Sequence, residues 1–250
     1  MQPVKEVGKT KMNRWKFLLL WILAVLFCMI FFTFLHECGH GFGARLEGTH
    51  ISTSFNRTGD VGKKPTDPDF RSNQNEVGTV DSSGLLGPFI NWTFAVVFTV
   101  LLITVKKKGS RQSLLFGACA VSNSILRFLP MLSFFLNAPF HRVHLEDEVE
   151  WGASSISSVH FPMPETAFVN LIKLHPMLFL SNPLFYFWPF ASMAIVTVCL
   201  VTAYRELNRQ FTIYIASKIF KLIFILAPIL AVPVWFVIIN TLDNVFRLNW

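Results

Sequence analysis

Hydrophobic residues in this sequence are gathered into five long stretches that are separated by polar segments. Each stretch carries almost no formal charge, and each is about long enough to cross ~30 Å of hydrocarbon as a helix. The stretches are Phe17–Leu35, Leu85–Val105, Ser113–Leu126 continued past Arg127 to Leu136, Pro183–Tyr204 and Leu222–Leu242. The pattern predicts an all-α polytopic membrane protein with about five transmembrane helices.

The composition agrees with this class and argues against a water-soluble globule. Hydrophobic residues make up 52% of the 250 residues and charged residues only 15%, and the mean hydropathy is +0.48. The longest polar segments, Arg45–Gly84 and Asn137–Asn182, are about 40 to 46 residues long, which is below the usual size of an independently folding module. We therefore expect no appended soluble domain.

Basic residues are distributed unevenly among the polar segments. Segments 1–16, 106–112 and 205–221 hold 5, 4 and 4 Lys and Arg, whereas the alternate segments, which are longer in total, hold 5, 2 and 1. Because Lys and Arg accumulate on the cytoplasmic side, this predicts a cytoplasmic N-terminus in a lipid bilayer. Membrane orientation thus explains the net charge of +7, and nucleic acid is not expected as a partner. No small-residue cleavage site follows the first stretch, so we expect a retained helix and not a signal peptide.

A metal-binding pattern follows directly after the first hydrophobic stretch. His36-Glu37-Cys38-Gly39-His40 reads HExxH, and no Pro interrupts the helix that is expected to continue through it. Two His at i and i+4 project from one face of a helix, where both imidazoles can bind one zinc ion. Glu37 is then placed to take a proton from a water molecule activated by the zinc. Ionisable residues close to hydrocarbon are costly and usually mark a functional site.

The surrounding residues resemble a known family. The HExxH motif, followed by Ala44-Arg45 and Gly48, resembles the HExGH…AR..G signature of the site-2 protease family of intramembrane zinc metalloproteases. Gly87-Pro88-Phe89-Ile90-Asn91 resembles that family's Gly-Pro-x-x-Asn element, and the resemblance covers roughly residues 30–150. It implies a zinc endopeptidase that acts on membrane proteins or peptides, with Asn91 beside the zinc, where it holds the substrate or the developing oxyanion.

Topology brings these motifs to one level of the membrane. The first helix ends at the outer side with His36 and His40, and the second helix begins there with Gly87 to Asn91. The third helix returns to the same side and delivers residues 137–150. The alternative for Asn91 is an Asn that only caps its helix.

The third zinc ligand is expected after the third hydrophobic stretch, because catalytic zinc usually keeps three protein ligands. The resemblance implies the Asp of an Asp-Gly pair that follows a Pro. Here Pro130 is followed first by Asp147, and Glu148 stands where Gly is expected. We expect Asp147 to be the ligand, with Glu148 and His144 as alternatives. A run of acids is more often a solvated face, which is the expectation for most residues between 146 and 150.

Three smaller features complete the expectations. Asn137-Ala138-Pro139 is predicted to break the third helix. Arg127 is expected to face the interior of the helix bundle, where it pairs with an acid or contacts the site. Alternating Ile51, Thr53 and Phe55 predict a short β segment within residues 49–56 of the first outer loop.

Together these features divide the chain into three parts. Residues 1–16 form a basic cytoplasmic N-terminus, residues 17–151 a metalloprotease core with three transmembrane helices, and residues 152–250 an outer loop with two further transmembrane helices. Two rival hypotheses remain open. A membrane di-iron hydroxylase or desaturase also uses pairs of His, but the chain has 7 His in all and Glu37 would have no role. A catalytically inactive, protease-like binding protein is the other, although Glu37 is present.

Overall fold

The computed structural model describes residues 13–48, 50–61, 83–143, 146–156 and 165–250. Five long helices dominate it, and each is long and apolar enough to cross a membrane. The prediction of an all-α polytopic membrane protein is therefore confirmed. The helices are α1 (Arg14–Leu46), α2 (Ser83–Thr104), α3 (Arg111–Asn137), α7 (Phe187–Gln210) and α8 (Lys218–Asp243).

The helix boundaries follow local chemistry. Asn13 caps the start of α1 by accepting a hydrogen bond from the Trp15 backbone N–H, and Ser110 caps α3 in the same way. The HExxH motif lies inside α1, which continues to Leu46 as expected. The predicted break after α3 is also confirmed, because the chain leaves α3 at Asn137 and enters a 3-10 turn, η2 (Ala138–Phe140).

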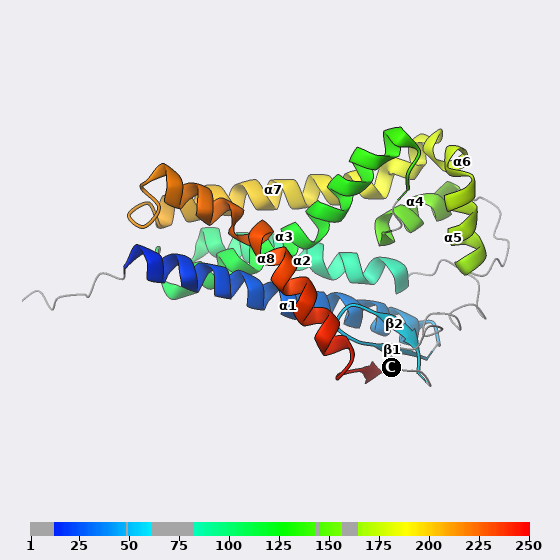
Figure 1. The fold of residues 1–250 in the computed structure, drawn as a ribbon, viewed down its shortest axis with the longest axis horizontal. Helices are drawn as coiled ribbons and strands as arrows, with labels where there is room; N and C mark the ends of the chain where they lie inside the picture. The colour runs from blue at the N-terminus through cyan, green and yellow to red at the C-terminus, as the bar shows by residue number, and fades with distance from the viewer. Residues whose placement is uncertain (1–12, 49, 62–82, 144–145, 157–164) are drawn as a thin grey trace, which may run out of the picture.

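The second polar segment contains short helices that hydropathy did not predict. They follow one another as α4 (Asp147–Ile156), α5 (Glu165–Leu174), α6 (Pro176–Leu180) and the 3-10 turn η3 (Pro183–Tyr186). Figure 1 shows them gathered at one end of the bundle. At Gly152 a Cβ atom would lie 2.1 Å from the Phe185 carbonyl oxygen, so α4 packs closely against η3 only because this residue is a glycine.

A small antiparallel sheet lies beside the same end of α1. The predicted β segment is confirmed as β1 (Ile51–Thr53), which pairs with β2 (Thr58–Asp60). Its other edge pairs with β3 (Leu248–Asn249), so the strand order is β2-β1-β3. The Trp250 indole donates to Thr53 Oγ1 at 2.8 Å and packs against α1 at Gly41. Sequence analysis did not predict that the C-terminal residues reach this sheet.

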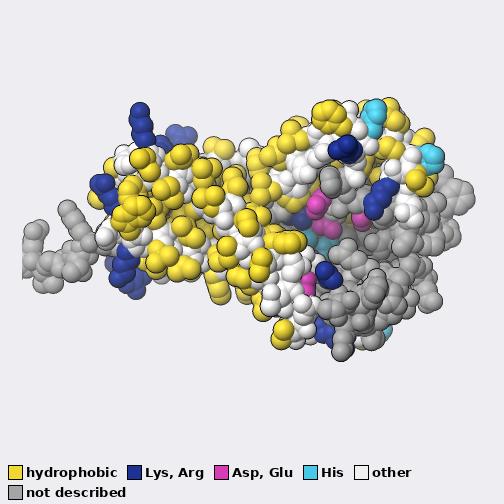
Figure 2. Space-filling view, viewed as in Figure 1, with side chains coloured by type: hydrophobic (Ala, Val, Ile, Leu, Met, Phe, Trp, Pro, Cys, Tyr) yellow, Lys and Arg dark blue, Asp and Glu magenta, His cyan; other side chains and the backbone are white. Residues whose placement is uncertain are grey.

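Two apolar clusters hold the helices together. The larger cluster packs α1 against α3, α7 and α8 around side chains such as Phe17, Trp21 and Phe224. The smaller one, around Phe134, Val149 and Phe185, packs α4 and η3 against α3. Figure 2 shows a broad hydrophobic surface over the middle of the bundle, as expected for helices in contact with lipid. Lys and Arg side chains lie toward both ends of the molecule, and Asp, Glu and His side chains lie in a recess toward one of them.

Candidate metal centre

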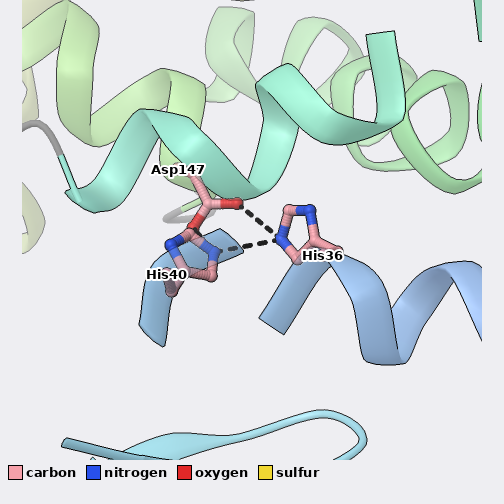
Figure 3. Close-up of side chains that lie close together, drawn as sticks. All are labelled: His36, His40 and Asp147. Atoms are coloured by element: carbon pink, nitrogen blue, oxygen red, sulfur yellow. Dashed lines mark hydrogen bonds and ion pairs between the residues drawn. The ribbon is translucent and has the colours of Figure 1, made fainter. Parts of the chain in front are cut away.

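Three side chains from two helices converge near the C-terminal end of α1. His36 and His40 project from the same face of α1, and their Nε2 atoms lie 3.1 Å apart. Asp147, at the first position of α4, places Oδ2 at 3.2 Å from His36 Nε2 and Oδ1 at 3.6 Å from His40 Nε2. Figure 3 shows the carboxylate approaching the two imidazoles from the side of the site opposite α1. Among the described residues, this is the group of His, Cys, Asp and Glu side chains that could hold a metal ion.

The spacing of these donor atoms suits zinc. A tetrahedral ion with ligands at about 2.0–2.1 Å requires neighbouring ligand atoms about 3.3 Å apart. The three observed separations of 3.1, 3.2 and 3.6 Å surround that value. Two neutral His and one carboxylate form a common set of ligands for catalytic zinc, and three protein ligands leave a fourth position open. The residues present therefore fit a zinc ion.

Helix α2 closes one side of the site because it carries a glycine there. A Cβ atom at Gly87 would lie 2.3 Å from His40 Nε2 and 2.8 Å from His36 Cε1. At Gly39, a Cβ atom would lie 2.8 Å from the Leu86 carbonyl oxygen of α2. Both positions must be occupied by glycine for α1 and α2 to approach this closely. The segment 87–91 thus begins directly against the rings of His36 and His40, as its position in the sequence predicted.

Asn91 contacts the ring of His36 from α2. Its Oδ1 lies 2.7 Å from His36 Nδ1, the nitrogen that faces away from Asp147, and its Nδ2 donates to Asn123 Oδ1 at 3.0 Å. The residue lies inside α2, so it does not cap the helix. Only 1% of its surface is exposed, and both polar ends of its amide are engaged. The predicted contact with substrate or oxyanion stays a prediction, whereas the contact with His36 is present.

Arg127 anchors α4 beside the His pair. Its Nε donates to Glu148 Oε1 at 2.9 Å, its second terminal nitrogen pairs with Glu148 Oε2, and the same nitrogen lies 3.3 Å from Asp147 Oδ2. Ser192 on α7 also donates to Glu148 Oε1, at 2.7 Å, and Trp92 on α2 donates to Ser192 Oγ. Four helices therefore share one hydrogen-bonded network, which fixes the backbone that carries Asp147. The expectation that Arg127 pairs with an acid in the bundle interior is confirmed.

The expectation of a solvated acidic face is wrong at Glu148. This side chain is fully buried, because Arg127 and Ser192 supply the charge and the hydrogen bonds that water would otherwise provide. Glu148 is consequently the partner of Arg127, while Asp147 is the acid that faces the two His. The other alternative ligand, His144, lies outside the described residues.

Two acids at the start of α4 differ in their electrostatics. Burial opposes ionisation of Asp147, but His40, His36 and Arg127 together hold the pKa of its carboxyl well below the ordinary value. Burial raises the pKa of Glu146 to about 7, and the charge of Asp147 acts in the same direction. Asp147 is therefore the carboxylate that stays ionised beside the imidazoles, and the ionised form is the one that binds metal.

Glu37 and the remaining residues complete the site. Glu37 follows His36 in α1 and is partly exposed, as a group that meets solvent or substrate has to be. Sequence reasoning missed Ser192 and Trp92, since a lone Ser or Trp in an apolar helix carries no pattern of its own. Asn123 is the residue that the sequence could have indicated, because an amide within an apolar, membrane-spanning stretch needs a polar partner.

Comparisons with protein-family models, with curated proteins and with solved structures found no match to this chain.

Proposed function

We propose that this chain is an intramembrane zinc metalloprotease that hydrolyses peptide bonds of membrane-embedded or membrane-adjacent substrates. The observation that carries the proposal is the convergence of three side chains, His36 and His40 on the HExxH helix α1 and Asp147 on α4. One ligand atom from each lies within 4.8 Å of the others. The resemblance of residues 36–48 and 87–91 to the site-2 protease family supports the same conclusion.

Each residue has a defined task in this proposal. His36, His40 and Asp147 hold the ion, and zinc bound there supplies Lewis-acid activation of water and of the scissile carbonyl. Glu37 takes a proton from the attacking water and delivers it to the nitrogen of the leaving amine. Asn91 contacts His36 directly and therefore fixes the orientation of that ring.

The position of the donors in the bundle supports a substrate at the membrane. His36 and His40 lie within α1, one of the five membrane-spanning candidates, and the hydrophobic surface of the bundle adjoins the recess that holds Asp, Glu and His side chains (Figure 2). A peptide that reaches this recess lies in or beside the bilayer. We infer that the substrate is a membrane protein or a membrane-associated peptide.

The two rival hypotheses differ in their support. A di-iron centre would draw on further His, but His141 is exposed on the turn after α3, and the third donor beside the His pair is a carboxylate. An inactive binding protein would have the same fold and the same ligands. Only a measurement of turnover separates it from an enzyme.

The decisive experiment compares wild-type protein with Glu37→Gln in reconstituted vesicles. Metal content is measured by plasma mass spectrometry, and cleavage of a panel of single-span membrane peptides is followed by mass spectrometry of the products. We expect about one zinc per chain in both proteins, and a loss of cleavage by ~10³-fold or more in Glu37→Gln. His36→Ala and His40→Ala should lose both properties. Full cleavage by Glu37→Gln would rule out the protease, and zinc without any turnover would favour the inactive binding protein.

A further inference from the structure

A chain of amide hydrogen bonds connects the backbone of α3 with His36. Asn123 Nδ2 donates to the Cys119 carbonyl at 2.8 Å, and Asn91 Nδ2 donates to Asn123 Oδ1 at 3.0 Å. Asn91 Oδ1 then lies 2.7 Å from His36 Nδ1. Asn91 and Asn123 are 1% and 0% exposed, so these groups satisfy their hydrogen bonds within the protein.

The Cys119 backbone carbonyl fixes the donor and acceptor of every hydrogen bond in this series. A carbonyl can only accept, so the amide nitrogen of Asn123 faces Cys119 and its amide oxygen faces Asn91. This oxygen needs a donor, so Asn91 turns its nitrogen toward Asn123 and its oxygen toward His36. An oxygen at 2.7 Å requires a proton on His36 Nδ1. With that proton on Nδ1, Nε2 is the ring nitrogen left to bind a metal ion, once it gives up any proton that it shares with Asp147 Oδ2, 3.2 Å away.

We propose that Asn123 is a positioning residue that sets the tautomer of His36 through Asn91 and so keeps His36 Nε2 available for a metal ion. Nε2 is the atom that faces His40 and Asp147. The effect on metal affinity rests on the proposed zinc site, whereas the proton on Nδ1 follows from the hydrogen bonds of Asn91 and Asn123 alone.

Asn91 by itself does not determine the tautomer. Its amide has nearly the same shape after a half-turn about the side chain, which exchanges the oxygen and the nitrogen. With the nitrogen toward His36, the ring would accept at Nδ1 and carry its proton on Nε2. That proton would point at Asp147 Oδ2, 3.2 Å away, and would block the lone pair that a metal needs. Asn123 on α3 prevents this half-turn, because its Oδ1 needs the Nδ2 donor of Asn91.

The test changes Asn123, at one end of the series of hydrogen bonds, and measures the position of the ring proton on His36, at the other end. Asn123→Leu removes the amide at similar volume, and Asn123→Ala, measured beside it, removes the amide without adding a branched side chain. In zinc-free protein labelled with 15N-histidine, the ring nitrogen shifts of His36, assigned with His36→Ala, should move toward the form protonated at Nε2. Zinc affinity, measured by competition with a chelator, should fall about 10- to 100-fold.

A matched control and a rescue separate positioning from packing. Ser122→Ala removes a buried 3.1 Å hydrogen bond from α3 to the Val25 carbonyl of α1, and it should change neither the tautomer nor the affinity. Asn91→Asp added to Asn123→Leu should restore both, because either oxygen of a carboxylate accepts from Nδ1. The inference is overturned if His36 keeps its proton on Nδ1 in both Asn123 variants, or if Ser122→Ala weakens zinc binding equally. If the parent binds no zinc, the proposed function fails and the nitrogen shifts still decide the inference.

Discussion

Two buried or nearly buried carboxylates lie at opposite ends of the bundle, and their surroundings differ. At the end with the His pair, Glu148 is fully buried and pairs with Arg127, whose side chain is only 7% exposed. At the other end, Glu206 on α7 accepts from Arg209 at 2.7 Å and from Lys108 at 3.2 Å, but the Arg209 side chain is 68% exposed. Both acids are paired with cations. Only the first pair is withdrawn from solvent.

The difference shows where the protein requires a fixed geometry. Ion pairs that are screened by solvent contribute at most about 1 kcal/mol and tolerate movement of their side chains. A buried pair is costly to desolvate, and removing one partner leaves an uncompensated charge. Glu148 lies next to Asp147 in α4, so the buried pair also determines where the carboxylate beside the two His is held. We conclude that the ion pair at the end with Arg127 holds α4 in a fixed position, and that the ion pairs of Glu206 do not fix their surroundings in this way.

The largest effect is expected from breaking the buried pair. Arg127→Met should lower the free energy of unfolding in detergent by about 3–5 kcal/mol, because Glu148 is left buried without its counter-charge. The matched change at the other end, Arg209→Met, should cost no more than about 1 kcal/mol. Replacing both members, as Arg127→Met with Glu148→Leu, should recover part of the lost stability. Equal losses for Arg127→Met and Arg209→Met would remove the contrast between the two ends.

Removing the proposed acidic ligand should affect the metal more than the fold. Asp147→Ala should lower zinc affinity by more than about 100-fold, since direct ligands exceed the 10- to 100-fold effect of their supporting partners. Glu150→Ala, in the same helix, serves as the control and should keep the zinc. Zinc content after dialysis against a graded chelator measures both. If Asp147→Ala keeps full metal and activity while Glu148→Ala or His144→Ala loses them, the ligand assignment is wrong and the protease proposal survives.

A smaller effect is expected from replacing a glycine with alanine, either beside the His pair or in the apolar cluster near Glu206. Gly87→Ala places a Cβ atom 2.3 Å from His40 Nε2, so the His pair must move and zinc affinity should fall by about tenfold or more. Gly117→Ala places a Cβ atom 2.4 Å from Leu207 Cδ2 in the apolar cluster, and it should cost about 1–3 kcal/mol of stability with zinc binding unchanged. Zinc titration and thermal unfolding of both variants provide the measurement. Normal zinc affinity in Gly87→Ala would contradict the arrangement of α2 against the site.

The smallest effect on the protein itself is expected from surface cysteines that report orientation. Arg142→Cys lies at the end with the His pair and Lys107→Cys at the opposite end, and both positions are exposed, so stability should change by less than about 0.5 kcal/mol. If the N-terminus is cytoplasmic, an impermeant maleimide should label Arg142→Cys in intact cells and Lys107→Cys only after lysis. The unmodified protein gives the background from the native cysteines. The reverse pattern would overturn the predicted orientation.

Much of the fold could be predicted because hydrophobic length and local breaks are written directly in the sequence. The five membrane-spanning candidates follow from uninterrupted apolar stretches, and the end of α3 follows from Asn137-Ala138-Pro139. The short helices α4, α5 and α6 could not be predicted in this way. They are too short to form long apolar stretches, although α4 and α5 are amphipathic, and they are held by packing against other elements, such as the contact of Gly152 with Phe185.

Within the site, the sequence by itself determined the residues whose geometry one helix provides. His36 and His40 are one turn apart on α1, so their convergence required only that the helix continue. The roles of Asp147 and Glu148 depended on the tertiary structure, because adjacent residues at the start of a helix point in different directions. Which of them faces the His pair depends on where Arg127 and Ser192 hold the other. A buried charge needs a partner distant in the sequence, and only the folded chain supplies it.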